Sequence, residues 1–275
     1  MSPSAHLPLP LSGVKILLTR PKANANGPGD SPSTPDALAL GLQSAGATIL
    51  SWPLIETSNI AFNLPEDFPS AYNGILVTSQ VAIRALYRQA DFLEKKPESL
   101  DWFAVGPKSA DTIKAESLQA QSDALNKIHI PKHFDALSAV EQWREAGLLK
   151  PGHRLLWPCG DLANTHLVNW LAQYQITLLP LIVYETRAIA FSKEERTQFK
   201  MVANASDCLV FTSPSAVEAY SKINPEHPQK QIAAMGASTA KAVESKWGRL
   251  DIRPQENTLE GLAKSIVTFY IANPV

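Results

Sequence analysis

Two serines stand at equivalent places in two similar stretches of this sequence, each directly after a short apolar run. Residues 74–79 read GILVTS and residues 208–213 read CLVFTS, so Ser79 and Ser213 each follow a predicted β-strand. A serine in this place caps the next helix, whose free backbone N–H groups and partial positive charge can bind an anion. Two interpretations stay open: capping alone, or capping together with contact to an anionic ligand.

A second pair of turns follows the same logic with a glycine at the end of the strand. Residues 105–110 read VGPKSA and residues 235–240 read MGASTA, and their glycines, Gly106 and Gly236, allow a close approach to the backbone. The hydroxyl groups of these turns belong to Ser109, Ser238 and Thr239. Four such turns in one cleft would suit a ligand with several carboxylates, since backbone donors bind anions without a basic protein.

Two further side chains could act at such a cleft. Arg20 comes just past a predicted strand over residues 14–18, where it could clamp a carboxylate or simply pair with a neighbouring acid. Tyr184 lies in the apolar stretch 181–185 and would bring a phenol to the cleft, although tyrosines in such positions also serve in packing. The pattern by itself leaves both choices open.

The usual cofactor and metal motifs are missing from the sequence. Neither G-x-G-x-x-G nor G-x-x-x-x-G-K-[ST] occurs, so a nucleotide cofactor is unsupported. The six histidines have no metal-ligand spacing, and we interpret the only two cysteines, Cys159 and Cys208, as buried small apolar residues. We therefore predict neither a metal nor a cofactor.

The elements that must position these residues alternate between short apolar runs and helical patterns, which is typical of an α/β fold with parallel sheets. A length of 275 residues suggests two domains, and 45% apolar residues exclude a disordered or fibrous chain. The formal charge of -1 argues against nucleic-acid binding, which needs clustered Lys and Arg.

Residues 1–18 have no basic segment and are interrupted by Pro3, Pro8 and Pro10, which fits neither a signal peptide nor a membrane span. We expect a cytoplasmic protein without membrane contact. The stretch 21–32 is long for a connection between a strand and a helix, and it is either a flap or a tolerated insertion.

The paired turns belong to an internal repeat that predicts two copies of one α/β unit. Residues 15–18 (KILL) likewise resemble residues 153–156 (HRLL). The repeat alone does not decide how the copies are threaded, but the match of Glu56-Thr57 with Glu185-Thr186 favours an interrupted first domain, because equivalent points then become the crossing points. The expected domains are residues 1–54 with 189–275, and residues 55–188, with linkers near 54–58 and 184–190.

Six short segments, in order along nearly the whole chain, are similar to those of one known family. They read ILLTRP at 16–21, ILVTS at 75–79, AVGPKSA at 104–110, VYET at 183–186, DCLVFTSPSAV at 207–217 and MGASTA at 235–240. In this order they resemble the uroporphyrinogen-III synthase family, whose members act in tetrapyrrole (heme) biosynthesis.

The resemblance implies two Rossmann-like (flavodoxin-like) parallel-sheet domains, joined by a two-stranded linker, with a cleft between them. It implies a cyclising lyase that converts linear hydroxymethylbilane to uroporphyrinogen III, with inversion of the terminal pyrrole ring and loss of water, and without a cofactor. This substrate carries carboxylates on every ring, in agreement with the anion-binding turns. Hydroxymethylbilane synthase is the implied transient partner, and we expect a monomer.

Residue by residue, the resemblance gives Tyr184 the catalytic place, because it matches the tyrosine of the family's Val-Tyr-x-Thr segment. Carboxylate contacts are implied for Ser79, Ser213, Ser238 and Thr239 and for the backbone around Gly106 and Gly236. The family often has Gly-Pro-Thr-Thr-Ala where this chain has GASTA at 236–240 and GPKSA at 106–110, so the hydroxyl groups are retained while the turns can differ.

The competing hypothesis is a two-domain module that binds a small polyanion without catalysis, as a transport protein or a sensor does. It shares the paired α/β domains and the cleft. It predicts an export signal or an attached DNA-binding unit, and the sequence has no recognisable trace of either. A relic without activity is a third hypothesis, against which the retained Tyr184 and the paired turns count.

Overall fold

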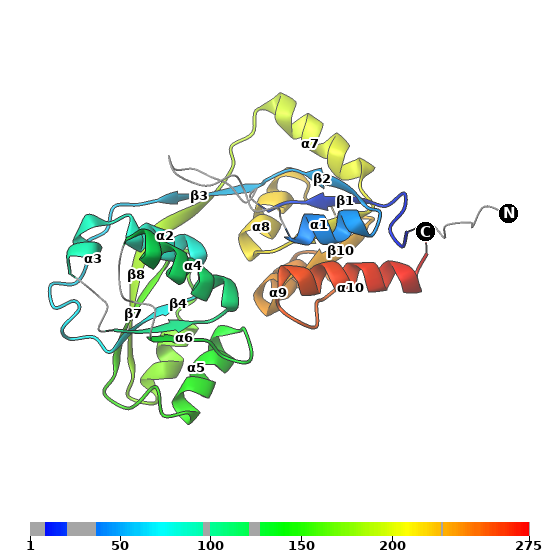
Figure 1. Ribbon diagram of the computed structural model, residues 1–275. Coiled ribbons are helices and arrows are strands. Elements are labelled where there is room, and N and C mark those ends of the chain that lie inside the picture. Colours follow the sequence, from blue (N-terminus) through cyan, green and yellow to red (C-terminus); the bar gives the residue numbers. More distant parts are fainter. Residues whose placement is uncertain (1–8, 21–36, 96–99, 121–126, 227, 275) are drawn as a thin grey trace. The chain divides into compact units, whose positions relative to one another are not determined.

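The computed structural model describes residues 9–20, 37–95, 100–120, 127–226 and 228–274, in which the chain forms two compact α/β units (Figure 1). Unit 1 comprises Met1–Glu56 and Arg187–Val275, and unit 2 comprises Thr57–Thr186. Unit 1 is therefore interrupted by unit 2 in the sequence. The stretch 21–32 lies outside the described residues.

Unit 1 is built on a parallel sheet of four strands in the order β10-β9-β1-β2. Its strands are β1 (Lys15–Leu18), β2 (Thr48–Ser51), β9 (Cys208–Phe211) and β10 (Gln231–Ala234). Helices cover both faces, so the central strand β9 is buried along its whole length. This burial explains why residues 208–211 form an unbroken apolar run instead of alternating with polar residues.

The helices of unit 1 form two layers. Helices α1 (Ala37–Ser44) and α10 (Leu259–Ala272) pack side by side on one face of the sheet (Figure 1). Helices α7 (Lys193–Ala205), α8 (Pro214–Ile223) and α9 (Ala237–Trp247) cover the other face. Each face thus has its own apolar core, as expected of a doubly wound α/β fold.

Unit 2 contains a sheet of six strands in the order β3-β8-β7-β4-β5-β6. Its strands are β3 (Ile55–Asn59), β4 (Gly74–Val77), β5 (Asp101–Ala104), β6 (Ile128–His129), β7 (Arg154–Gly160) and β8 (Thr177–Ala188). The pairs β4–β5, β5–β6, β4–β7 and β7–β8 are all parallel. The predicted α/β class with parallel sheets is therefore confirmed in both units.

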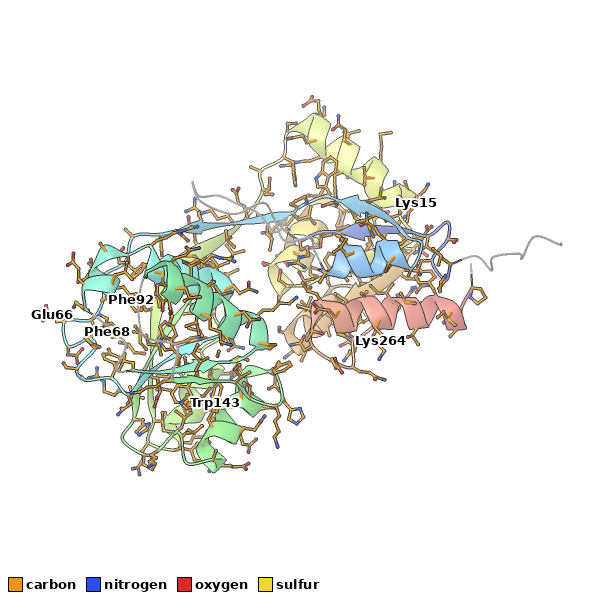
Figure 2. All side chains as sticks on the ribbon, in the orientation of Figure 1. Lys15, Glu66, Phe68, Phe92, Trp143 and Lys264 are labelled. Carbon is orange, nitrogen blue, oxygen red and sulfur yellow. The ribbon has the colours of Figure 1, made fainter. Side chains whose placement is uncertain are left out.

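The helices of unit 2 also form two layers. One core packs under α2 (Gln80–Tyr87), α3 (Ala90–Glu94) and α4 (Pro107–Gln119), and the other under α5 (Ala136–Glu145) and α6 (His166–Ala172). Figure 2 labels Phe92 of the first core and Trp143 of the second. The rings of Phe68 and Phe92 stack with their centroids 6.1 Å apart.

The two units repeat one topological feature. In unit 1, β9 and β1 are neighbours whose following helices, α8 and α1, lie on opposite faces of the sheet. In unit 2, β4 and β7 are neighbours whose following helices, α2 and α6, do the same. Such a switch point opens a crevice beyond the carboxyl ends of the two strands, where α/β proteins bind ligands. Within each unit, repeated segments of the sequence lie at its switch point.

The chain passes between the units along β3 and along the end of β8, which run side by side. The N–H of Ile189 donates to the carbonyl of Leu54 at 3.0 Å, and the N–H of Ile60 donates to the carbonyl of Val183 at 3.2 Å. The order of these partners makes β3 antiparallel to β8. Two strands thus join the units, as the resemblance implied. None of the described helices is both long and apolar enough to cross a membrane.

Candidate functional site

The proposed binding residues line one edge of each sheet, the edge at which the parallel strands end, which we call the carboxyl edge. In unit 1, Arg20, Ser213 and Gly236 follow the neighbouring strands β1, β9 and β10. In unit 2, Ser79 and Gly106 follow the neighbours β4 and β5. The fold therefore gathers these residues within each unit, at or beside its switch point.

The serines after β4 and β9 are helix N-caps, as their sequence pattern predicts. Ser79 has an extended backbone (φ -142°, ψ 130°), and its hydroxyl accepts from the N–H of Ala82 at 3.5 Å. Ser213 has nearly the same backbone (φ -152°, ψ 152°) and accepts from the N–H of Ala216 at 3.3 Å. Both hydroxyl groups are half-buried. The remaining N–H groups of each first turn can still bind an anion.

The two glycine turns differ from each other in what they require of the backbone. Gly236 has φ +79° and ψ 156°, a conformation that is essentially restricted to glycine. A Cβ atom there would lie 3.2 Å from Oδ1 of Asn257. Gly106 has the ordinary extended values of φ -147° and ψ 161°, and a Cβ atom there would meet nothing within 4 Å. The helix turn after Gly106 is thus open on the side where a side chain would stand.

The hydroxyl groups of these turns have very different exposures. Ser238 is exposed, whereas Ser109 and Thr239 are only 8% and 2% exposed. An exposed Ser238 can contact a ligand directly. Contact with Ser109 or Thr239 would require a ligand that reaches into the first turn of α4 or α9.

Arg20 stands where the sequence pattern predicts, at the end of β1. The preceding residue, Thr19, is fully buried and fixes the end of this strand. Its hydroxyl donates to the carbonyl of Val210 at 2.9 Å, and its own carbonyl accepts from the N–H of Leu54 at 3.1 Å. The half-buried Arg20 is therefore anchored at the junction of β1 with β9.

The phenol of Tyr184 comes together with Ser79 at the switch point of unit 2. Tyr184 lies on β8, and its side chain lies beside that of Ser79. Burial raises the pKa of the phenol above its usual value of 10.0, and the negative charge of Asp161 acts in the same direction, while the hydroxyl group of Ser79 opposes them. The phenol is therefore held in its protonated, proton-donating form.

Three residues near these turns escaped the sequence reasoning. Gly160 ends β7 and Asp161 follows it, and both contact Tyr184, while Asn257 lies against Gly236. A glycine at the end of the apolar run 155–159 was a usable signal for Gly160. Asp161 and Asn257 are ordinary loop residues in the sequence, and only the fold brings them to the carboxyl edge.

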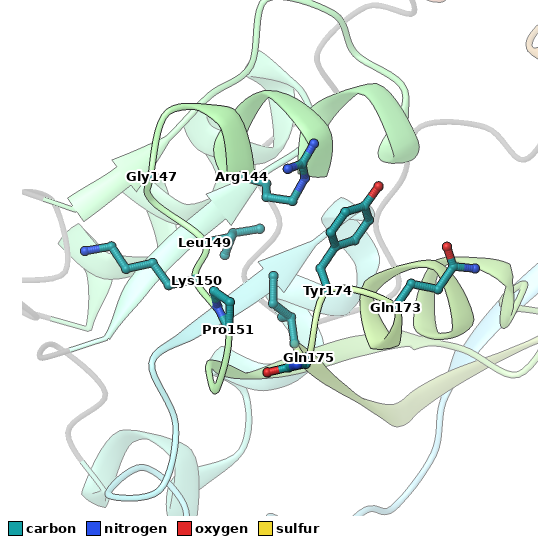
Figure 3. A pocket seen from close by; sticks show the side chains of 9 residues that line it. Arg144, Gly147, Leu149, Lys150, Pro151, Gln173, Tyr174 and Gln175 are labelled. Atoms are coloured by element: carbon teal, nitrogen blue, oxygen red, sulfur yellow. The ribbon is translucent and has the colours of Figure 1, made fainter.

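A cavity of about 400 Å³ in unit 2 lies at the other end of the sheet (Figure 3). The loops that precede β7 and β8 line it, with Arg144 and Tyr174 among the lining residues. The guanidinium carbon of Arg144 lies 4.4 Å from the centroid of the Tyr174 ring. This cavity contains none of the residues predicted from the motifs. Across the part of the chain that the structure describes, no three His, Cys, Asp or Glu side chains form a cluster able to hold a metal ion.

Comparisons with known proteins point to the family suggested by the motifs. A uroporphyrinogen-III synthase from Chlorobaculum parvum is 26% identical over 91% of this chain and 97% of its own length, and one from Synechococcus elongatus is 24% identical over 94% and 96%. The crystal structure of uroporphyrinogen-III synthetase from Helicobacter pylori has the same fold, with a TM-score of 0.61, 15% identity and coverage of 93% of this chain and 99% of that chain. The family model described as "Uroporphyrinogen-III synthase HemD" matches residues 36–266. The chain belongs to the uroporphyrinogen-III synthase family.

Proposed function

We propose that this chain cyclises hydroxymethylbilane to uroporphyrinogen III, with inversion of the terminal pyrrole ring and loss of water. Membership in the family makes it an enzyme, a cyclising lyase of tetrapyrrole biosynthesis. The structural observation that supports the assignment is the position of Tyr184 beside Ser79, because it brings a protonated phenol to the first turn of a helix whose free N–H groups can bind an anion.

The reaction needs positioning more than it needs strong acids or bases. The electron-rich pyrrole expels the hydroxyl group, and the open chain can then close without help to the isomer that lacks the inversion. An enzyme must hold the acetate and propionate arms so that the substituted carbon of the last ring is attacked, which gives a spiro intermediate that rearranges. Orientation of bound reacting groups is itself a large catalytic effect.

The turns at the carboxyl edges supply donors for these arms. We assign carboxylate contacts to Ser79 and to the turn at Gly106 and Ser109 in unit 2. In unit 1 we assign them to the side chain of Arg20 and to the turns that carry Ser213, Gly236, Ser238 and Thr239. N–H groups in the first turn of a helix, supplemented by hydroxyl groups, bind carboxylates while the protein remains nearly neutral.

Tyr184 has the catalytic place in this proposal. Its phenol donates a hydrogen bond to the departing hydroxyl group and helps to orient it. A phenol is a weak acid, and burial makes Tyr184 weaker still, so it assists departure without being indispensable. Ser79 then has two tasks, since it caps α2 and holds the phenol.

We further propose that the enzyme acts as a monomer in the cytoplasm and takes the unstable bilane from hydroxymethylbilane synthase in a transient encounter. Both cysteines are free and buried, which suits a reducing compartment.

The rate at which hydroxymethylbilane disappears separates this function from the binding-module hypothesis. The enzyme accelerates the loss of freshly generated bilane above the spontaneous rate. A module that only binds would protect the bilane and slow its closure. A rate at or below that of the protein-free control, with a protein shown to be folded, would overturn the proposal.

A further inference from the structure

Gly160 and Tyr184 are in direct contact, and the contact leaves no room for a side chain on the glycine. A Cβ atom on Gly160 would lie 2.6 Å from both Cε2 and Cζ of the Tyr184 ring and 3.0 Å from its hydroxyl oxygen. Gly160 is not among the residues with positive φ, so its backbone does not itself require glycine. The absence of a side chain at Gly160 therefore makes room for the ring of Tyr184 and is not required by the backbone conformation.

An irregularity in the pairing of β7 with β8 turns Tyr184 toward this contact. Cys159 pairs with Ile182, but Gly160 pairs with Tyr184, so Val183 is an extra residue on β8. Before this point the strand alternates, and Leu179, Leu181 and Val183 pack on the core under α2 to α4. Tyr184 packs on the same core directly after Val183. A bulge of this kind redirects one side chain, and bulges are frequent next to active sites.

Asp161 fixes the backbone that directly follows the phenol-bearing carbon of Tyr184. Its N–H donates to the carbonyl of Tyr184 at 3.0 Å, and its carboxylate oxygen Oδ1 accepts from the N–H of Thr186 at 2.9 Å. The segment 184–186 is thereby bound to the end of β7. The carboxylate is exposed, and its charge lies close enough to favour the protonated form of the phenol.

We propose that Gly160 and Asp161 are positioning residues for Tyr184. Gly160 leaves the space in which the ring lies against Ser79, and Asp161 holds the strand segment that carries the ring. The inference rests on the proposed function, since Tyr184 is the group that acts on the substrate. It deepens that proposal by naming what holds the phenol in place.

The test combines Gly160→Ala with Tyr184→Phe. Gly160→Ala moves the ring away from Ser79, and we expect turnover for uroporphyrinogen III formation to fall about 10- to 100-fold with a smaller change in KM. In the Tyr184→Phe background the same substitution changes turnover by less than about twofold, because the group it acts through is gone. An equal loss in both backgrounds would overturn the proposal.

Two substitutions of Asp161 test its role, one that keeps the hydrogen-bond acceptor and one that removes it. Asp161→Asn keeps an acceptor for the N–H of Thr186 and retains most of the turnover, whereas Asp161→Ala lowers it toward the Tyr184→Phe level. Asp135→Asn is the matched control. Asp135 also accepts a backbone N–H, that of Ser138 at 2.9 Å, but it caps α5, which follows the edge strand β6 in the chain and is not part of the site. Equal turnover in Asp161→Ala and the parent would contradict the role of Asp161.

A spectroscopic readout separates failure of this inference from failure of the proposed function. In an NMR spectrum of protein with isotope-labelled tyrosine, the resonance of Tyr184 is identified because it is absent from the spectrum of Tyr184→Phe. Gly160→Ala is expected to shift that signal, because the added methyl group displaces the ring. An unmoved signal overturns the positioning role, whatever the activity. A moved signal with full activity in Tyr184→Phe upholds positioning and removes Tyr184 from catalysis.

Discussion

The side chain of Tyr184 lies beside that of Ser79, although the two residues stand far apart in the sequence. Ser79 follows β4 and caps α2, while Tyr184 lies on β8. Strand β7 lies between β4 and β8 in the sheet, and its end carries Gly160, whose missing side chain gives the ring its place. A phenol and the first turn of helix α2, which we propose binds a carboxylate, thereby share one location.

Replacement of Tyr184 by phenylalanine tests the phenol without disturbing the ring. We expect turnover to fall about 10- to 100-fold, because a general acid that only assists contributes at the low end of the usual range. The measurement is the initial rate of uroporphyrinogen III formation, with the circular dichroism spectrum as the control for folding. Full turnover would remove Tyr184 from the mechanism.

Substitution of Ser213 by alanine separates capping from ligand contact. Loss of the cap on α8 costs about 1 kcal/mol of stability. Ser192→Ala removes a comparable cap from α7, where the hydroxyl accepts from the N–H of Glu195 at 3.1 Å. Chemical denaturation should show similar losses in both variants, whereas KM should rise only in Ser213→Ala. Equal KM values would reduce Ser213 to a cap.

The two glycine turns should respond in opposite ways to alanine. Gly236→Ala forces a side chain into a conformation that costs about 1–3 kcal/mol, and it presses on Asn257. Gly106→Ala meets no protein atom and leaves the free energy of unfolding unchanged to within about 0.5 kcal/mol. If the turn at Gly106 binds substrate, this stable variant should still raise KM several-fold. Unchanged kinetics in Gly106→Ala would exclude close approach of the substrate there.

Features that depend on a single strand, turn or helix could be predicted from the sequence. Ser79 and Ser213 cap helices because an apolar strand, a serine and a helix follow each other locally, and the fold class follows from the same rhythm. Cys159 and Cys208 are buried as predicted, at 2% and 0% exposure. Such features need no knowledge of which strands become neighbours.

The neighbours of Tyr184 could not be found in this way. Gly160 reaches the ring only because β7 and β8 pair with an extra residue on β8, and a one-residue change of register redirects a side chain. Asn257 lies against Gly236 through the loop before α10, which no local pattern indicates. The exposure of hydroxyl groups also depends on packing, which is why Ser238 and Thr239 differ although they are adjacent.

The pH dependence of the reaction should reflect the raised pKa of Tyr184. The protonated phenol is the active form, so its contribution to turnover persists through neutral pH and is lost only above about pH 10. The contribution of Tyr184 to stability depends on pH in the same direction. It is complete below the pKa that the phenol has in the unfolded chain, and it is lost as the pH rises through the higher pKa of the folded protein. Turnover measured against pH should show this alkaline limb in the parent and lack it in Tyr184→Phe. An alkaline loss of turnover that persists in Tyr184→Phe would come from another ionisable group.

Thiol reactivity gives an independent check of the two cores. Burial raises the pKa of Cys159 to about 11 and raises that of Cys208 as well, so neither forms a thiolate at neutral pH. Iodoacetamide should leave both cysteines unmodified in the native protein and label both after denaturation, as mass spectrometry would detect. Rapid labelling of native protein would contradict the packing around β7 or β9.

The isomer composition of the product tests the central claim most directly. Freshly generated hydroxymethylbilane closes without help to uroporphyrinogen I, so a protein-free sample supplies the background. The account predicts that uroporphyrinogen III predominates when the purified protein is added, and that its share rises with protein concentration. A ratio of the two isomers equal to that of the protein-free sample, with folded protein at every concentration, would contradict it.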